Sequence, residues 1–152
     1  MKIDGKDREI LRLVQKDAKM TAKEMSRKIN SPITTVFAKI KRMEKEGIIK
    51  GYTAVLDSKK LDRPITAFIF TSFSKAEHTS QRDVVKEIGR MHQVQEVHIV
   101  TGDWDIIMKI KEKDIESVGK FVVDNLRGMK GIEKTLTVLA LESEKESTEI
   151  SI

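Results

Sequence analysis

The stretch from Ser31 to Lys45, "SPITTVFAKIKRMEK", carries residue types that suit contact with a nucleic acid. On a helix with 100° per residue, one side is an apolar stripe that comprises Ile33, Val36, Ile40 and Met43. The opposite side comprises Thr34, Thr35, Ala38 and Arg42, flanked by Lys41 and Lys45. Threonine can bond to a base edge or contact a thymine methyl, alanine permits close approach, and basic side chains pair with phosphates. This face predicts DNA binding; the alternative is the basic solvated face of a small helical bundle.

The charge distribution suggests that only the first part of the chain binds a polyanion. Residues 1–60 hold 16 Lys or Arg and 8 Asp or Glu, a charge of +8, whereas residues 61–152 hold 13 and 16, a charge of −3. A basic segment on a mildly acidic remainder is typical of a nucleic-acid-binding domain joined to another domain. Uneven surface charge without a partner remains the simpler alternative.

A second candidate site is the segment "TGDWD", residues 101–105. Backbone amides around Gly102 could hold an α-carboxylate, and Asp103 or Asp105 could pair with an α-ammonium. The simpler interpretation is a hairpin turn in which glycine supplies a positive φ and Trp104 packs on a neighbour. Two strand threonines, Thr135 and Thr137, could add hydroxyls, although threonine is common in strands without any binding role.

Three short helices are expected to position the basic face. Asp4 can cap the first, which has an inward stripe at Ile10, Leu13 and Val14. "TAKE", Thr21 to Glu24, is a capping box that begins the second. Ser31 is expected to cap the third, with Pro32 at its first position, and Gly47 is expected to end it. A short second helix, a tight turn and a third helix form a helix-turn-helix.

Beyond residue 56 the hydrophobic pattern changes from helical spacing to alternation. We place a DNA-binding domain at 1–56, a polar linker at 57–64, a second domain at 65–142 and a polar tail without regular structure at 143–152. The second domain predicts strands at 65–73, 94–101, 104–111 and 131–141, with helices at 80–91 and 114–126. Gly102-Asp103 predicts a short hairpin between the middle strands. The order βαββαβ is that of the ferredoxin-like fold, so the chain is expected to be α+β.

Both faces of the predicted sheet are apolar. Phe68 and Phe70 alternate with Ala67 and Ile69, and Leu136 and Val138 alternate with Leu139 and Leu141. Two helices can cover only one face, so we expect a second subunit to cover the other.

Several classes of protein are disfavoured by what the sequence lacks. It has no cysteine, and His78, His92 and His98 have neither metal-ligand spacing nor a partnered nucleophile. We therefore expect neither an enzyme nor a metal site, and no cofactor. The apolar run "ITAFIF" is too short to span a bilayer, and the first residues lack the apolar stretch of a signal peptide, so a cytosolic protein is expected.

Residues 7–57, "DREILRLVQKDAKMTAKEMSRKINSPITTVFAKIKRMEKEGIIKGYTAVLD", resemble the N-terminal domain of the Lrp/AsnC, or feast/famine, regulators. "QEVHIVTGDWDIIMKI" and "GIEKTLTVLAL" are similar to the effector-binding and assembly domain of that family. The resemblance implies dimers that associate further, often to octamers, and amino-acid effectors bound around "TGDWD" between subunits. It also implies that Thr34, Thr35, Ala38, Lys39 and Arg42 lie on the DNA-reading helix. The sequence departs from the family pattern at two positions. Phe37 occupies a position that is more often polar in the family, and Gln93 replaces a common proline.

The sequence thus predicts a DNA-binding regulator whose assembly or DNA binding is modulated by an amino-acid-type effector. The predicted DNA contacts are Ser31, Thr34, Thr35, Ala38, Lys39, Lys41, Arg42 and Lys45. The predicted effector contacts are Thr101, Gly102, Asp103, Trp104, Asp105, Thr135 and Thr137. Alternatives are an architectural DNA-binding protein without an effector, and a small enzyme or ligand carrier with an incidental basic domain. The orientation of Phe37 is left open.

Overall fold

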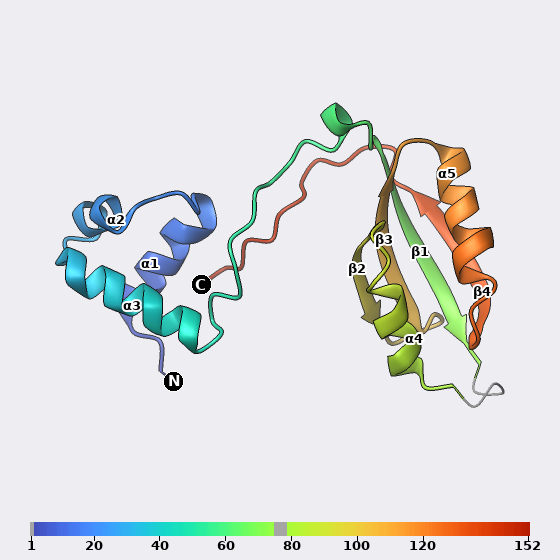
Figure 1. Cartoon of the computed structure of the whole chain (residues 1–152), viewed down its shortest axis with the longest axis horizontal. Helices are drawn as coiled ribbons and strands as arrows, with labels where there is room; N and C mark the ends of the chain where they lie inside the picture. Colours follow the sequence, from blue (N-terminus) through green and yellow to red (C-terminus); the bar gives the residue numbers. More distant parts are fainter. Residues whose placement is uncertain (1, 75–78) are drawn as a thin grey trace. The chain divides into compact units, whose positions relative to one another are not determined.

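The computed structural model describes residues 2–74 and 79–152, which divide into two units (Figure 1). The helical unit comprises the described residues up to Val55 together with Lys145–Ile152. The sheet unit comprises the described part of Leu56–Glu144. Among the described residues, no helix has the length and apolar character needed to cross a membrane.

Reciprocal caps begin the first two helices of the helical unit. The Asp4 carboxylate accepts from the Asp7 amide at 2.8 Å and the Asp7 carboxylate from the Asp4 amide at 3.0 Å, which begins α1 (Gly5–Lys16). Thr21 and Glu24 make the predicted capping box at the start of α2 (Ala22–Lys28).

The start of α3 (Ile33–Lys45) differs from the prediction. Its N-cap is Pro32, with no side-chain hydrogen bond, so the prediction that Ser31 caps the helix is wrong. The reason is the turn after α2, where Asn30 has φ +47° and the main chain of Ser31 is bonded to Ser26. Gly47, with φ +70°, ends α3 as predicted.

The core of the helical unit lies where the three helices meet, and it comprises Ile10, Val14, Met25, Ile29, Val36 and Met43. Ile40 packs against this core while partly buried. Ile33 is 47% exposed, so the prediction that it belongs to the apolar core stripe is wrong. It lies in the first turn of α3, beyond the edge of the core.

The sheet unit has the predicted βαββαβ order. Its elements are β1 (Ile65–Phe73), α4 (Gln81–Ile88), β2 (Val94–Ile99), β3 (Ile106–Glu112), α5 (Ile115–Lys120) with a π-helical continuation (Phe121–Leu126), and β4 (Ile132–Leu139). The strands are antiparallel in the order β2-β3-β1-β4, which is the ferredoxin-like arrangement. A short 3₁₀ helix, Lys59–Leu61, interrupts the segment predicted as a linker.

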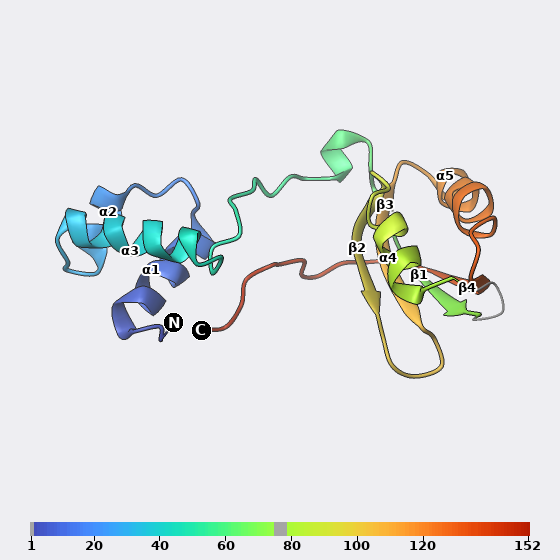
Figure 2. The ribbon, with the colours of Figure 1, turned by 60° about the horizontal axis from the view of Figure 1, so that its bottom comes forward.

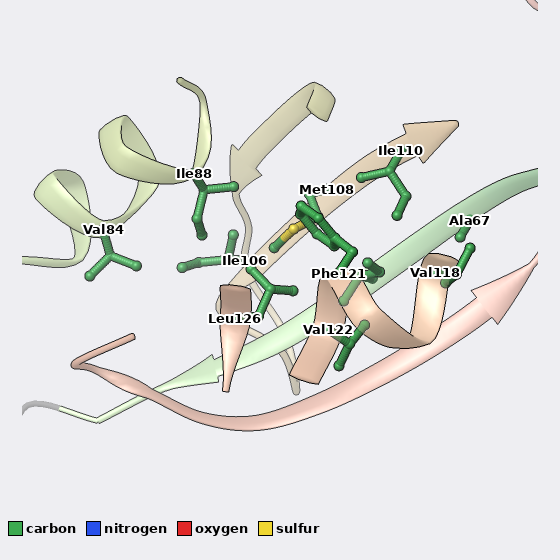
Figure 3. Packing of buried hydrophobic residues seen from close by; sticks show 11 residues of the cluster. Ala67, Val84, Ile88, Ile106, Met108, Ile110, Val118, Phe121, Val122 and Leu126 are labelled. Atoms are coloured by element: carbon green, nitrogen blue, oxygen red, sulfur yellow. The ribbon is translucent and has the colours of Figure 1, made fainter. Parts of the chain in front are cut away.

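The helices cover one face of the sheet. Ala67, Met108 and Ile110 point into a core closed by Val84 and Phe121 (Figure 3). Ile69 is fully buried in the same core. On the other face Leu136 and Val138 are each 44% exposed, and Phe68 and Phe70 are half-buried. The predicted alternation is confirmed, and the second subunit over the open face stays a prediction.

The connection between β2 and β3 is longer than predicted. The ladder ends at the pair Ile99 and Ile106, so residues 100–105 form a loop that projects beyond the strands (Figure 2). The two-residue hairpin turn predicted from Gly102-Asp103 is therefore wrong. The loop closes instead through the Val100 amide, which donates to the Asp105 carbonyl at 2.9 Å.

Candidate nucleic-acid interface and ligand-binding loop

Several predicted contact residues gather on the outward side of α3. Thr34, Thr35 and Ala38 are exposed in its first two turns. Together with Lys39 and Arg42 they line a shallow hollow of about 390 Å³. Ser31 precedes the helix and is half-buried, so it lies apart from this hollow. The small residues thus come first and the basic residues follow, as the spacing predicts.

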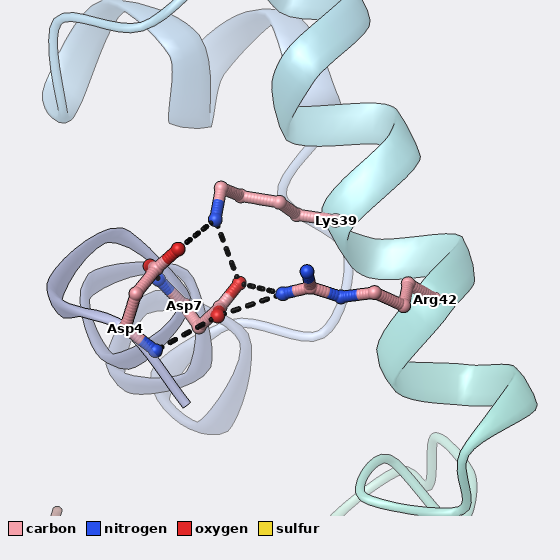
Figure 4. A network of polar contacts seen from close by, with 4 residues as sticks. All are labelled: Asp4, Asp7, Lys39 and Arg42. Carbon is pink, nitrogen blue, oxygen red and sulfur yellow. Dashed lines mark hydrogen bonds and ion pairs between the residues drawn. The ribbon is translucent and has the colours of Figure 1, made fainter. Parts of the chain in front are cut away.

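A buried carboxylate holds the basic side of the hollow. Asp7 in α1 has a fully buried side chain, and Nη2 of Arg42 lies 2.7 Å from both of its oxygens (Figure 4). Nζ of Lys39 donates to Asp7 at 3.0 Å and also to Asp4. No local spacing in the sequence indicates this network, because its carboxylates and its cations are 35 residues apart.

The contact between Lys39 and Asp4 favours the charged form of both groups. The hydrogen bond from Lys39 lowers the pKa of Asp4 to about 2, with help from the Asp7 amide. The same pair raises the pKa of Lys39. Because two carboxylates face two cations, the cluster carries no net charge at neutral pH.

The other two cations of α3 are Lys41 and Lys45. Lys41 pairs with Glu44 at 2.8 Å, and its side chain remains 58% exposed. Lys45 is exposed and makes no ion pair with any residue in the described ranges. These two lysines are the cations best placed to meet phosphates.

Phe37 is a residue whose role the sequence left open. It is 55% exposed on α3, and the ammonium of Lys41 lies 5.7 Å from its ring centroid. A large apolar ring on the same helix as Thr34 and Ala38 has no core contact to explain it. In the sequence, this exposure could be inferred because Phe37 directly follows the core residue Val36 and is turned 100° away from it on the helix.

The loop of residues 100–105 places the predicted effector residues in different environments. Thr101, Gly102 and Asp103 are exposed, and Gly102 has φ +113°. Asp105 is engaged, since its carboxylate accepts from the Phe73 amide at 2.7 Å and its amide donates to the Thr71 carbonyl.

The remaining predicted effector residues lie on opposite faces of the sheet. The Trp104 ring lies 6.3 Å from that of Phe70, which belongs to the open face. Thr135 and Thr137 are in register with Thr71 and Ile69, which are buried on the helix-covered face. The structure thus brings together Thr101 to Asp103 but separates Trp104 from the two threonines.

The histidines do not gather. His92 and His98 are exposed, His98 lies 3.7 Å from Glu96, and His78 falls outside the described residues. Within residues 2–74 and 79–152, no three His, Asp or Glu side chains converge as metal ligands would.

Comparison with known families assigns both parts of the chain. Residues 3–50 match the family model of winged helix-turn-helix DNA-binding domains, and residues 66–150 match that of the Lrp/AsnC ligand binding domain. An uncharacterized HTH-type transcriptional regulator of Pyrococcus horikoshii is 35% identical over 144 residues, which are 95% of this chain and 96% of that protein. The HTH-type transcriptional regulator FL11 of Pyrococcus furiosus is 31% identical over 99% of this chain and 97% of its own length.

Solved structures show the same fold. A transcriptional regulator of Neisseria meningitidis, determined as its L-Met complex, superposes with a TM-score of 0.92 at 23% identity, over 99% of this chain and 97% of that one. AsnC of E. coli superposes with a TM-score of 0.86 at 21% identity, over 98% and 99% of the two chains. At these identities the likeness concerns the fold alone.

Proposed function

Because the chain belongs to the Lrp/AsnC family of transcriptional regulators, we propose that it binds a specific DNA sequence through α3 and responds to an amino-acid-type effector. The proposal of DNA binding rests on the order of side chains along α3. Thr34, Thr35 and Ala38 are exposed at its start, and exposed lysines lie in its later turns. The start of a recognition helix reaches base edges in the major groove, and its later turns approach the backbone.

The network around Asp7 helps to divide the predicted contacts on α3 into three roles. Thr34, Thr35 and Ala38 would contact base edges, and Lys41 and Lys45 would contact phosphates. Arg42 and Lys39 would mainly fix the position of α3, since their cationic groups are bonded to Asp7. Arg42 is 42% exposed, so one side of its guanidinium stays available to the DNA.

Gel retardation on a fragment of the gene's own promoter and on random DNA tests this proposal. We expect tighter binding to the promoter. Lys45→Ala should weaken binding to both fragments and reduce the salt slope by about 1, because one phosphate contact is lost. Thr35→Val, which keeps the shape but removes the hydroxyl, should weaken only promoter binding.

The matched control is Lys130→Ala, at an exposed lysine of the sheet unit. If Lys130→Ala lowers affinity as much as Lys45→Ala, α3 is not the DNA-binding helix. Equal affinity of the unmodified protein for promoter and random DNA would favour the architectural alternative.

We place the effector at the loop of residues 101–103, on two grounds. The main chain there is exposed around a positive-φ glycine and can offer amides to a carboxylate. The Neisseria regulator of the same fold was determined with L-Met, which suggests an α-amino acid as the class of ligand. Asp103 directly follows Gly102 and is exposed, so we assign it the α-ammonium. Trp104, Asp105, Thr135 and Thr137 have less support, because the first two are engaged elsewhere and the threonines lie on the helix-covered face.

Gly102→Val tests the loop. A β-branched residue is strained at φ +113°, so we expect the amides to be displaced and the effector response to be lost, while DNA binding without effector is kept. Calorimetry with the twenty L-amino acids measures the first effect and gel retardation the second. Unaltered binding of an amino acid by Gly102→Val would place the pocket elsewhere.

We also propose that a second copy covers the open face formed by Phe68, Phe70, Leu136 and Val138, and that such dimers assemble further. The effector would then act by favouring one assembly state over another. Leu136→Lys should lower the molar mass measured by light scattering, whereas Lys130→Ala should not. No cofactor or metal forms part of this proposal.

A further inference from the structure

The segment Lys145–Ile152 belongs to the helical unit, although it follows β4 of the sheet unit in the chain. As expected, it contains no helix or strand, but its main chain is hydrogen-bonded to α1. We call residues 145–152 the tail segment. Side chains of α1 form hydrogen bonds with the main chain of the tail segment.

Gln15 of α1 binds both main-chain polar groups of Ile150. Its Nε2 donates to the Ile150 carbonyl at 3.1 Å, and its Oε1 accepts from the Ile150 amide at 2.7 Å. A primary amide that meets the N–H and C=O of one residue recognises extended backbone without regard to the side chain. One turn earlier on α1, Nε of Arg12 donates to the main-chain oxygen of Ile152 at 2.6 Å.

The two anchored residues alternate as in a β-strand. Ile150 and Ile152 are two residues apart, so their side chains point to the same side of an extended segment. On that side lies a cavity of about 280 Å³ between α1, residues 48–55 and the tail segment. Its walls are mainly apolar and include Leu11, Val14, Ala18, Ile49, Tyr52, Ile150 and Ile152.

We propose that the groove between α1 and residues 48–55 is a docking site for an extended peptide, and that its occupant is the tail segment of the same chain. Gln15 and Arg12 select an extended backbone, and the apolar walls partly cover the side chain of Ile152. Ile150 lines the same groove but is 70% exposed, so its main chain rather than its side chain anchors it. Docking gives the helical unit a second connection to the sheet unit, through residues 140–144, in addition to the one after Val55.

Amide hydrogen exchange of the intact chain tests the docking. We expect the Ile150 amide to exchange at least ten-fold more slowly than in an unstructured peptide of residues 145–152, because it is bonded to Gln15. Gln15→Met keeps the size and helix propensity of the side chain but removes both hydrogen bonds, so it should abolish most of this protection. The matched control Gln95→Met, at an exposed glutamine of β2, should leave it unchanged.

Three outcomes would overturn the proposal. The first is an Ile150 amide that exchanges in the intact chain as fast as in the free peptide. The second is equal protection in Gln15→Met and Gln95→Met. The third is protection that falls on dilution through the range in which the oligomer dissociates, which would assign the occupant to another copy of the chain. None of these measurements involves DNA or an effector, so failure of the proposed function would leave the result interpretable.

Discussion

Nη2 of Arg42 in α3 lies 2.7 Å from each carboxylate oxygen of Asp7 in α1, and the Asp7 side chain is completely buried. This contact links the candidate DNA-reading helix to the first helix of the same unit. A buried carboxylate is tolerated only when cations and hydrogen-bond donors surround it, as Lys39 and the Asp4 amide do here. The orientation of α3 therefore depends on Asp7, which precedes Arg42 by 35 positions.

Asp7→Asn is the first test, because it preserves shape and removes charge. Lys39 and Arg42 would lose their buried counterion, and we expect the free energy of unfolding to fall by about 2–3 kcal/mol, less than for a fully buried pair since Arg42 is half-exposed. Urea unfolding followed by circular dichroism measures this. Asp83→Asn, which breaks an exposed pair with Lys86, is the control and should cost less than about 0.5 kcal/mol. Equal effects of the two variants would contradict the role of Asp7.

The pKa of Asp4 predicts an acid-dependent loss of stability. Its folded-state pKa is about 2, below the ordinary 3.8, because Lys39 donates to it. The stabilisation is therefore present above about pH 4 and is lost as the pH falls towards 2. Asp4→Asn keeps a good N-cap without the charge, so the stability difference between the two proteins should shrink over this interval. If the stability difference stays constant between pH 4 and pH 2, the contact with Lys39 does not lower the pKa of Asp4.

Tyr52 is the single tyrosine, so its ionisation can be followed alone by absorbance near 295 nm. Burial, followed by its hydrogen bond to Glu44, raises its pKa to about 12. The neutral phenol is thus favoured in the folded state, and its contribution to stability is lost as the pH rises from 10 through 12. Glu44→Gln should lower the midpoint while leaving it above 10, because burial is the larger cause. A midpoint near 10 in the folded protein would contradict this environment of the half-exposed phenol.

Gly131 precedes β4 at a position that only glycine fits. It has φ +89°, and a Cβ added there would lie 2.6 Å from Cε2 of Phe73. Gly131→Ala should therefore destabilise the sheet unit by about 2–4 kcal/mol, measured by chemical unfolding. Gly128→Ala, where a Cβ meets no atom within 4 Å, is the matched control and should change stability little. Comparable losses in both variants would mean that Phe73 moves aside freely.

Phe37 is predicted to contact a thymine methyl group, if α3 enters the major groove as proposed. Its ring is exposed beside the small residues at the start of the helix, and apolar side chains commonly meet this methyl. Replacing thymine by uracil at the contacted position removes one methyl, worth about 0.8 kcal/mol or a four-fold loss of affinity. Phe37→Ala should bind the two DNAs equally. Retention of the full thymine preference in Phe37→Ala would remove Phe37 from the interface.

Features fixed by neighbouring residues could be predicted from the sequence. The capping box of Thr21 and Glu24, the stop at Gly47 and the alternation in β1 each depend on a few adjacent positions, and the structure contains all three. In the second half of the chain, the order of strands and helices was enough to predict the ferredoxin-like fold.

Features that depend on distant contacts were missed. Ser31 was expected to cap α3, but its main chain bonds to Ser26 in the turn. The pairing of Asp7 with Arg42, and that of Gln15 with Ile150, join segments that no periodicity relates. For the same reason, spacing alone could not show that Thr135 and Trp104 lie on different faces of the sheet.

The contact between Gln15 and Ile150 also has a consequence for synthesis on the ribosome. The two residues are 135 positions apart. At about 5–20 residues per second, the groove on α1 emerges on the order of 10 s before its occupant. During that interval Leu11 and the apolar side chains around it face solvent on a nascent chain whose three helices can already fold. The apolar side chains of this groove would thus stay uncovered until the tail segment has been translated.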